Sequence, residues 1–287
     1  MKLARFSSGD SPRLGVVLDG SVVDLHDAAP DLPAEMPDLL ALGEHGLEKA
    51  LEAANGGSKR IALEDVKLMA PIARPPKFLA VGLNYADHVA ETGLETPTFP
   101  LVFAKMPSCV TGPTDPVERP IASDRLDWEG ELAFVISKRC RHVKRDDAAS
   151  VIGGYTIVND VSVRDWQMRT SQWILGKSFD THGPMGPWLV TGEELDPHAL
   201  PIRTLVNGEV RQSSNTKHLI FNCFDLVETL STVFTLEPGD VVATGTPGGV
   251  GNAMQPPQFL KPGDTVRIEI EGIGAIQNTV VEEGRTD

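Results

Sequence analysis

Two glutamates at the start of an apolar segment restrict how this chain can fold. Residues 127–136 read DWEGELAFVI, in which Glu129 and Glu131 lead directly into an apolar run. Side chains two residues apart on a strand point to the same face, with roughly 6.5–7 Å of backbone between them. Carboxylates that lead into a buried strand repel one another and lose hydration unless a positive charge lies between them. The segment therefore predicts a strand that begins at a polar pocket and continues into the core.

A third carboxylate follows a second apolar run. Tyr155–Val158 is predicted to be a strand, and Asn159 and Asp160 come directly after it. Glu129, Glu131 and Asp160 would offer only oxygen ligands, which suit a hard divalent cation such as Mg²⁺, Mn²⁺ or Ca²⁺ better than zinc. The alternative is that the two glutamates line the wet face of an amphipathic strand. The E-x-E spacing alone does not decide between these interpretations.

Length, charge and cysteine content narrow the class of protein. A chain of 287 residues with 41% hydrophobic residues predicts one small and one large domain, which we place at residues 1–70 (a small N-terminal α+β domain) and 71–287. A net charge of −14 without a lysine- or arginine-rich patch argues against a nucleic-acid partner. The three cysteines are far apart, the first ten residues lack the apolar core of a signal peptide, and no run approaches a membrane span. We therefore expect a cytoplasmic protein without membrane contacts.

The periodicity of apolar residues indicates an α+β fold in which strands predominate. The elements predicted near the N-terminus are strands at 2–6, 14–18 and 21–25, a helix at 37–54 and a proline-rich linker at 70–77. Those predicted further along are a hairpin at 205–210 with an Asn-Gly turn, a core helix at 222–234 and final strands that end near residue 281.

His88 and Glu91 are three residues apart in a segment predicted to form one helical turn, so their side chains share a face. A carboxylate beside an imidazole fixes its tautomer and raises its basicity, which produces a base able to activate water. An exposed turn with an incidental ion pair is the alternative, and it is the favoured interpretation of a bare H-x-x-E pattern.

Cationic and amide side chains follow the third carboxylate. Arg164 and Gln167 come four and seven residues after Asp160, the spacing of one helical face, so both can point into the same pocket. Arginine offers a carboxylate a two-pronged donor, and the amide of Gln167 can donate to a keto or carboxylate oxygen. Lys177 lies among apolar residues, where an unpaired ammonium would be costly to desolvate. We expect it to balance part of the negative charge of the carboxylates.

Several of these motifs resemble those of the fumarylacetoacetate hydrolase family. They are E-G-E at 129–131, Asp160, R-D-W-Q at 164–167 and G-K-S-F-D at 176–180, with V-G-L-N-Y-A-D-H-V-A-E at 81–91 and T-G-T-P-G-G-V-G at 244–251. The last segment is rich in glycine but lacks the ending of a P-loop and the spacing of a dinucleotide loop, so we exclude nucleotide binding. The resemblance covers roughly residues 75 to 282 and implies the mixed-sheet β-roll or sandwich of that family.

The resemblance also implies roles for individual residues. It implies metal ligands at Glu129, Glu131 and Asp160, catalytic roles for His88, Glu91 and Lys177, and substrate binding by Tyr85, Lys105, Arg164, Gln167 and Thr246. In relatives the segment of His88 and Glu91 orders over the substrate, and the counterpart of Thr246 contacts the substrate carboxylate. Relatives commonly dimerise, so we expect a homodimer by analogy.

On this basis we expect a metal-dependent hydrolase that cleaves a C–C bond in an acylpyruvate or 2,4-diketo acid to give pyruvate and a carboxylic acid. The ion would act as a Lewis acid on the keto oxygen, and His88 would activate water. A decarboxylase of the oxaloacetate type and an isomerase or hydratase of 2-hydroxy-dienedioates would use the same residues, so the motifs leave these activities open. A module that binds a metal or an anion without catalysis is a further alternative.

Overall fold

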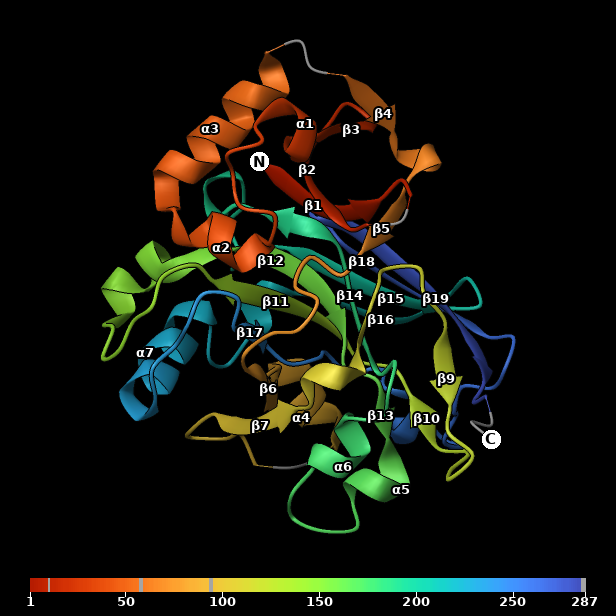
Figure 1. Ribbon diagram of the computed structural model, residues 1–287. Helices are drawn as coiled ribbons and strands as arrows, with labels where there is room; N and C mark the ends of the chain where they lie inside the picture. Colours follow the sequence, from red (N-terminus) through yellow and green to blue (C-terminus); the bar gives the residue numbers. More distant parts are fainter. Residues whose placement is uncertain (10, 57–58, 93–94, 285–287) are drawn as a thin grey trace.

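The computed structural model describes residues 1–9, 11–56, 59–92 and 95–284, apart from the side chains of His88, Ala90, Thr92 and Glu193. It confirms an α+β fold in which strands predominate. A long mixed sheet has the strand order β4-β3-β2-β1-β14-β12-β11-β17-β6-β7, and a smaller sheet has the order β16-β15-β18-β19-β9 (Figure 1). A short ladder of β10 and β13 lies below the long sheet in Figure 1, beside α5 and α6.

The bounds of these elements are as follows. The long sheet and its side pairings comprise β1 (Lys2–Ser7), β2 (Arg13–Leu18), β3 (Ser21–Asp24), β4 (Arg60–Ala62), β5 (Lys67–Met69), β6 (Phe78–Gly82), β7 (Leu101–Lys105), β8 (Val110–Thr111), β11 (Gly130–Ile136), β12 (Ile152–Asn159), β14 (Gly183–Val190) and β17 (Val241–Ala243). The remaining strands are β9 (Val117–Arg119), β10 (Leu126–Asp127), β13 (Ser162–Val163), β15 (Pro201–Val206), β16 (Glu209–Asn215), β18 (Thr265–Ile270) and β19 (Gly274–Glu282). The helices are α1 (Leu25–Ala28), α2 (Met36–Ala41), α3 (Gly43–Asn55), α4 (Ala86–Thr92), α5 (Arg164–Gln167), α6 (Ile174–Lys177) and α7 (Cys223–Val233).

Strand β11 is buried along its whole length because apolar clusters pack against both of its faces. Leu132, Phe134 and Ile136 belong to one cluster, and Ala133 and Val135 belong to the other. This division follows the period of two along a strand. A strand of this kind can carry a polar side chain only at its end, which is where the glutamates lie.

The N-terminal strands continue the long sheet, since β1 pairs with β2 on one side and with β14 on the other. The expected helix at 37–54 is corrected to two helices, because the chain turns at Gly43, whose φ of 62° ends α2 before α3 begins. The predicted strand at 21–25 stops at Asp24, whose side chain accepts a hydrogen bond from His26 N and caps α1. The domain boundary near residue 70 stays a prediction.

Two elements predicted further along the chain are confirmed. The hairpin of β15 and β16 turns at Asn207 and Gly208, which have φ values of 53° and 83°. Helix α7 begins after Asn222, which forms a capping box with Asp225. Among the described residues, no helix is long and apolar enough to cross a membrane.

Candidate active site

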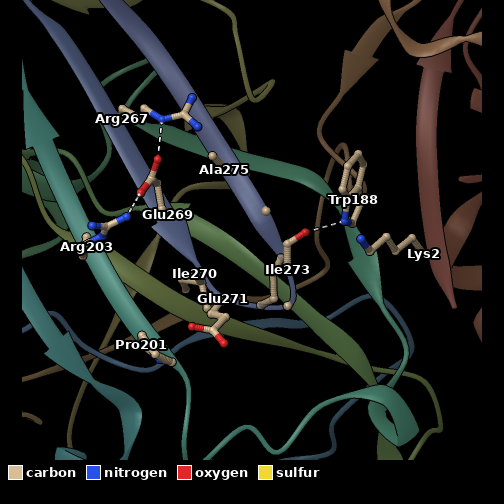
Figure 2. Close-up of a pocket in the computed structure, with 12 residues that line it drawn as sticks. Lys2, Trp188, Pro201, Arg203, Arg267, Glu269, Ile270, Glu271, Ile273 and Ala275 are labelled. Carbon is tan, nitrogen blue, oxygen red and sulfur yellow. Dashed lines mark hydrogen bonds and ion pairs between the residues drawn. The ribbon is translucent and has the colours of Figure 1, made fainter. Parts of the chain in front are cut away.

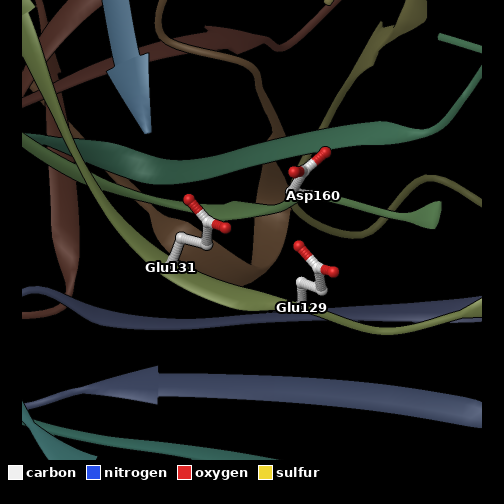
Figure 3. A group of neighbouring side chains, drawn as sticks. All are labelled: Glu129, Glu131 and Asp160. Carbon is white, nitrogen blue, oxygen red and sulfur yellow. The ribbon is translucent and has the colours of Figure 1, made fainter. Parts of the chain in front are cut away.

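Antiparallel pairing brings the three predicted carboxylates together. Gly130 at the start of β11 pairs with Asn159 at the end of β12, so Glu129, Glu131 and Asp160 meet at one edge of this ladder. One oxygen from each carboxylate lies within 4.8 Å of those of the other two, and Figure 3 shows the three side chains converging. All three are buried. Burial, together with the charges of Asp160 and Glu129, raises the pKa of Glu131 well above its ordinary value.

Two lysines lie against these carboxylates. Lys177 Nζ is 2.7 Å from Glu129 Oε2 and 2.7 Å from Asp160 Oδ2. Lys105 Nζ is 2.7 Å from the other oxygen of Asp160, and it also donates to the backbone oxygen of Lys177. Although burial opposes it, the charge of Asp160 raises the pKa of Lys105 above its ordinary value. Both ammonium groups therefore serve as counterions of the buried acids.

Arg164 completes the cationic set from the single turn of α5. Its Nη1 donates to Glu129 Oε1 at 2.6 Å and to Gln167 Oε1 at 2.9 Å, and its Nε donates to Asp127 Oδ2 at 2.7 Å. Its Nη2 is buried and has no hydrogen-bond partner within the described structure. The structure thus places Arg164 and Gln167 side by side, as their spacing predicted, and leaves one guanidinium nitrogen able to bind an anion.

Asp127 is a buried residue that the sequence interpretation missed. Its Oδ1 accepts from Trp128 N at 2.8 Å and from Gly251 N at 2.7 Å, while its Oδ2 accepts from Asn252 N at 2.9 Å and from Arg164 Nε. It therefore links the arginine to the loop that follows β17. The signal was present, because Asp127 continues the two-residue alternation of the glutamates.

The loop that follows β17 closes the other side of the cluster. Gly245 N donates to Glu131 Oε2 at 2.8 Å, and the hydroxyl of Thr246 donates to Gly130 O at 3.1 Å and accepts from Gln212 Nε2 at 2.8 Å. At Gly249 a Cβ would lie 1.9 Å from a backbone oxygen of β16, so only glycine allows this approach. Gln212, which the sequence interpretation also missed, accepts a hydrogen bond from Gly130 N at 3.0 Å.

Helix α4 carries the predicted His88 and Glu91. The side chain of His88 lies outside the described part of the structure. The carboxylate of Glu91 accepts from Gly249 N, at 3.1 Å to one oxygen and 3.0 Å to the other. Tyr85, just before the helix, is fully buried, and its hydroxyl has no hydrogen-bond partner in the described residues. Burial, with the charge of Glu131 adding to it, raises the pKa of Tyr85 well above its ordinary value.

A cavity of about 210 Å³ opens beside the cluster. Its lining comprises Val81, Gly82, Leu83, Phe103, Glu129, Glu131, Arg164, Gln167, Met168, Trp173, Lys177, Thr246, Val250, Asn252 and Ala253. Lys105 and Tyr85 are buried and are absent from this lining, so their substrate contacts stay predictions. A larger cavity of about 750 Å³ lies elsewhere, along β18 and β19, and its Arg203 and Arg267 are both paired with Glu269 (Figure 2). The smaller cavity is therefore the candidate active site.

Comparison with known proteins supports this fold and identifies the family of the chain. The family model described as "Fumarylacetoacetate (FAA) hydrolase C-terminal" matches residues 77–281. The chain is 45% identical over 288 residues to "Oxaloacetate tautomerase fahd2, mitochondrial" of Xenopus laevis, covering 98% of this chain and 90% of that protein. It is 44% identical to "Oxaloacetate tautomerase FAHD2A, mitochondrial" of Homo sapiens, covering 98% and 92%. Since both relatives are named mitochondrial, they do not support a purely cytoplasmic location.

Solved structures of similar proteins point to the same family. A fumarylacetoacetate hydrolase from Exiguobacterium antarcticum matches with a TM-score of 0.89 and 37% identity, covering 99% of this chain and all of that one. A maleylpyruvate hydrolase from Sphingobium sp. SYK-6, in complex with a manganese(II) ion and pyruvate, matches with a TM-score of 0.82, 36% identity and the same coverage. A 2-hydroxyhepta-2,4-diene-1,7-dioate isomerase from Mycobacterium marinum matches with a TM-score of 0.78, 35% identity and the same coverage. The chain therefore belongs to the fumarylacetoacetate hydrolase family of enzymes, whose members here include tautomerases, isomerases and hydrolases.

Proposed function

We propose that this protein is a divalent-metal-dependent tautomerase that interconverts the enol and keto forms of a small 2-keto dicarboxylic acid of the oxaloacetate type. The observation that carries the proposal is the buried cluster of Glu129, Glu131 and Asp160 at the wall of a small cavity, with Lys177 and Arg164 beside it. The tautomerases named above support it, since each matches 98% of the chain at 44–45% identity.

The donor set fits a hard divalent cation. Three buried carboxylates with one oxygen each inside a 4.8 Å group suit Mg²⁺ or Mn²⁺, because such ions prefer oxygen ligands. Glu129, Glu131 and Asp160 would hold the ion. When bound, it supplies a Lewis acid that polarises the keto oxygen of the substrate and stabilises the negative charge developing there.

The cavity favours a small, anionic substrate. Its volume of about 210 Å³ is below the ~300–1,000 Å³ of pockets that take drug-sized ligands. Arg164 Nη2, which has no partner in the described residues, would donate to a substrate carboxylate. Gln167 uses its carbonyl oxygen for Arg164, which leaves its amide nitrogen to donate to the substrate. Thr246 holds the loop against Gly130 and so keeps the wall of the cavity in place.

Tautomerisation moves one proton between a carbon and an oxygen of the substrate and breaks no C–C bond. His88 on α4 is the proposed carrier of this proton, and Glu91 joins α4 to the loop after β17 through Gly249 N. Lys177, which lines the cavity, would hold the oxygen on which negative charge develops. No attacking water is needed.

The hydrolysis of acylpyruvates expected from the sequence has weaker support. The hydrolase that carries manganese and pyruvate is a structural neighbour at 36% identity, whereas the tautomerases reach 45%. The motifs suit both activities, since each depends on polarisation of the same keto oxygen.

A panel assay separates the possible activities. The purified protein, supplied with Mg²⁺ or Mn²⁺, is mixed with freshly dissolved enol oxaloacetate, and the ultraviolet absorbance of the enol and the release of pyruvate are followed together. We expect rapid loss of the enol without stoichiometric pyruvate. Pyruvate released in step with enol loss would identify a decarboxylase. Faster cleavage of acylpyruvates than either reaction of oxaloacetate would identify a hydrolase. Asp160→Asn is the inactive control.

A further inference from the structure

Lys177 occupies the position between two of the three carboxylates. Its Nζ is 2.7 Å from both Glu129 Oε2 and Asp160 Oδ2, and its side chain is only 1% exposed. In the part of the chain that the structure describes, the hydrogen bonds of this ammonium go to these two oxygens alone. A divalent ion shared by Glu129 and Asp160 would need the same oxygens or the ones beside them.

The other two oxygens are held by cations that are anchored elsewhere. Glu129 Oε1 accepts from Arg164, whose guanidinium is also fixed by Asp127. Asp160 Oδ1 is paired with Lys105, whose Nζ is also held by the backbone oxygen of Lys177. Lys105 is absent from the lining of the cavity, and Arg164, which lines it, is held in place by Asp127. Lys177 lines the cavity too, but its ammonium has no anchor of this kind among the described residues. It is the cation best placed to leave.

We propose that Lys177 is an exchangeable counterion: it holds Glu129 and Asp160 together without an ion, and it moves into the cavity when a divalent ion takes its place. The proposal rests on the metal site of the proposed function and specifies how that site is filled. The released ammonium, already 5.1 Å from the ring of Phe103, then faces the substrate. Ion binding would therefore promote binding of an anionic substrate in the cavity.

Calorimetric titration with Mn²⁺ tests the exchange. Lys177→Met removes the competing ammonium, and Lys105→Met is the matched control, since it removes the same charge from the same 2.7 Å distance to Asp160 without touching the contact that must break. Loss of either positive charge strengthens cation binding in general. We expect Lys177→Met to lower the Kd by about tenfold or more beyond the effect of Lys105→Met, because two charge-assisted hydrogen bonds no longer have to be broken.

The outcomes separate this inference from the proposed function. Equal effects of the two variants, or weaker binding by Lys177→Met, would overturn the exchange while leaving the metal site intact. Absence of Mn²⁺ binding in the wild type and in both variants would overturn the proposed function as well. Thermal unfolding adds a second measure: Lys177→Met without Mn²⁺ should unfold at a lower Tm than the wild type, and Mn²⁺ should raise its Tm by more.

A measurement on the wild-type protein guards against variants that fail to fold. Amine-reactive labelling read by mass spectrometry reports whether Lys177 is free, with the peptide of Lys105 as the internal reference. We expect Mn²⁺ to increase labelling of Lys177 several-fold while that of Lys105 stays low. Unchanged or reduced labelling of Lys177 in the loaded protein would contradict the exchange.

Discussion

Two cavities in the described part of this protein contain similar ion pairs in opposite surroundings. In the larger one, Glu269 lies 2.7 Å from both Arg203 and Arg267, and the three side chains are 27%, 56% and 44% exposed (Figure 2). In the smaller one, Lys177 lies at the same 2.7 Å from Glu129, and the two side chains are 1% and 9% exposed. Exposed pairs contribute little because water screens them, whereas a buried charge without its partner is costly. Although the distances are equal, the difference in burial predicts that mutations in the smaller cavity have much larger effects than mutations in the larger one.

The largest effect is expected where a carboxylate of the buried cluster is removed. Asp160→Asn takes away a proposed metal ligand together with the partner of Lys105 and Lys177. We expect tautomerase activity to fall on the order of a thousandfold, because an ion of this kind supplies several kcal/mol of transition-state stabilisation. Initial rates and Mn²⁺ affinity, measured on the same preparation, check this. A variant that kept both would show that the cluster does not bind the ion.

Asp127→Asn should have the next largest effect, although Asp127 is not a proposed metal ligand. The change weakens the anchor of Arg164 and places an N–H group among four donors, so we expect a loss of about 3 kcal/mol in the free energy of unfolding. We also expect KM to rise about tenfold with a smaller change in kcat, since a loosened Arg164 would hold the proposed substrate carboxylate less well.

Asp165→Asn is the matched control for this prediction. Asp165 lies on the same turn of α5, but its carboxylate accepts from Ser123 Oγ. We expect Asp165→Asn to leave KM unchanged, because no hydrogen bond or ion pair joins Asp165 to the guanidinium of Arg164 in the described structure. If Asp127→Asn lowered stability but left KM as unchanged as Asp165→Asn does, Asp127 would have a purely structural role, and the positioning of Arg164 would be contradicted.

A smaller effect is expected from His182, a buried histidine behind Lys105. Its Nε2 donates to Glu118 O at 2.8 Å, and burial lowers the pKa of the imidazole to about 3. Because the unfolded chain then binds more protons than the folded one between pH 6.5 and pH 3, stability is lost as the pH falls through this range. From pH 6.5 to pH 5 this amounts to about 2 kcal/mol. The free energy of unfolding, measured in denaturant at several pH values in this range, should depend less steeply on pH in His182→Gln than in the wild type. The same dependence on pH in both proteins would contradict the lowered pKa of His182.

The carboxylate cluster was predictable because it depends on local periodicity. Glu129 and Glu131 share a face through the period of two along a strand, and Asp160 ends the next apolar run, which pairs with the first. The hairpin at Asn207 and Gly208 was predictable for a similar reason, since its signal lies within two residues.

Contacts between distant segments were not predictable in this way. Asp127 shares the alternation of the glutamates, but its partners Gly251 and Asn252 come from a loop more than a hundred residues away. Gln212 reaches Gly130 from the other sheet, and nothing in the local pattern of β16 indicates this. The position of Lys105 behind Asp160 likewise depends on packing between α6 and β7.

The smallest effect is expected from Glu269→Gln in the larger cavity. Both arginine partners are about half exposed, so water replaces most of what the glutamate provides, and we expect the free energy of unfolding to change by less than about 1 kcal/mol. The carboxylate is far from the proposed metal ligands along the chain and lines a different cavity, so activity should stay at the wild-type level. Unfolding in denaturant and the enol assay on the same sample check both expectations. A large loss of stability or of activity would show that burial does not explain the difference between the two cavities. It would also assign a role of their own to the arginines of β15 and β18.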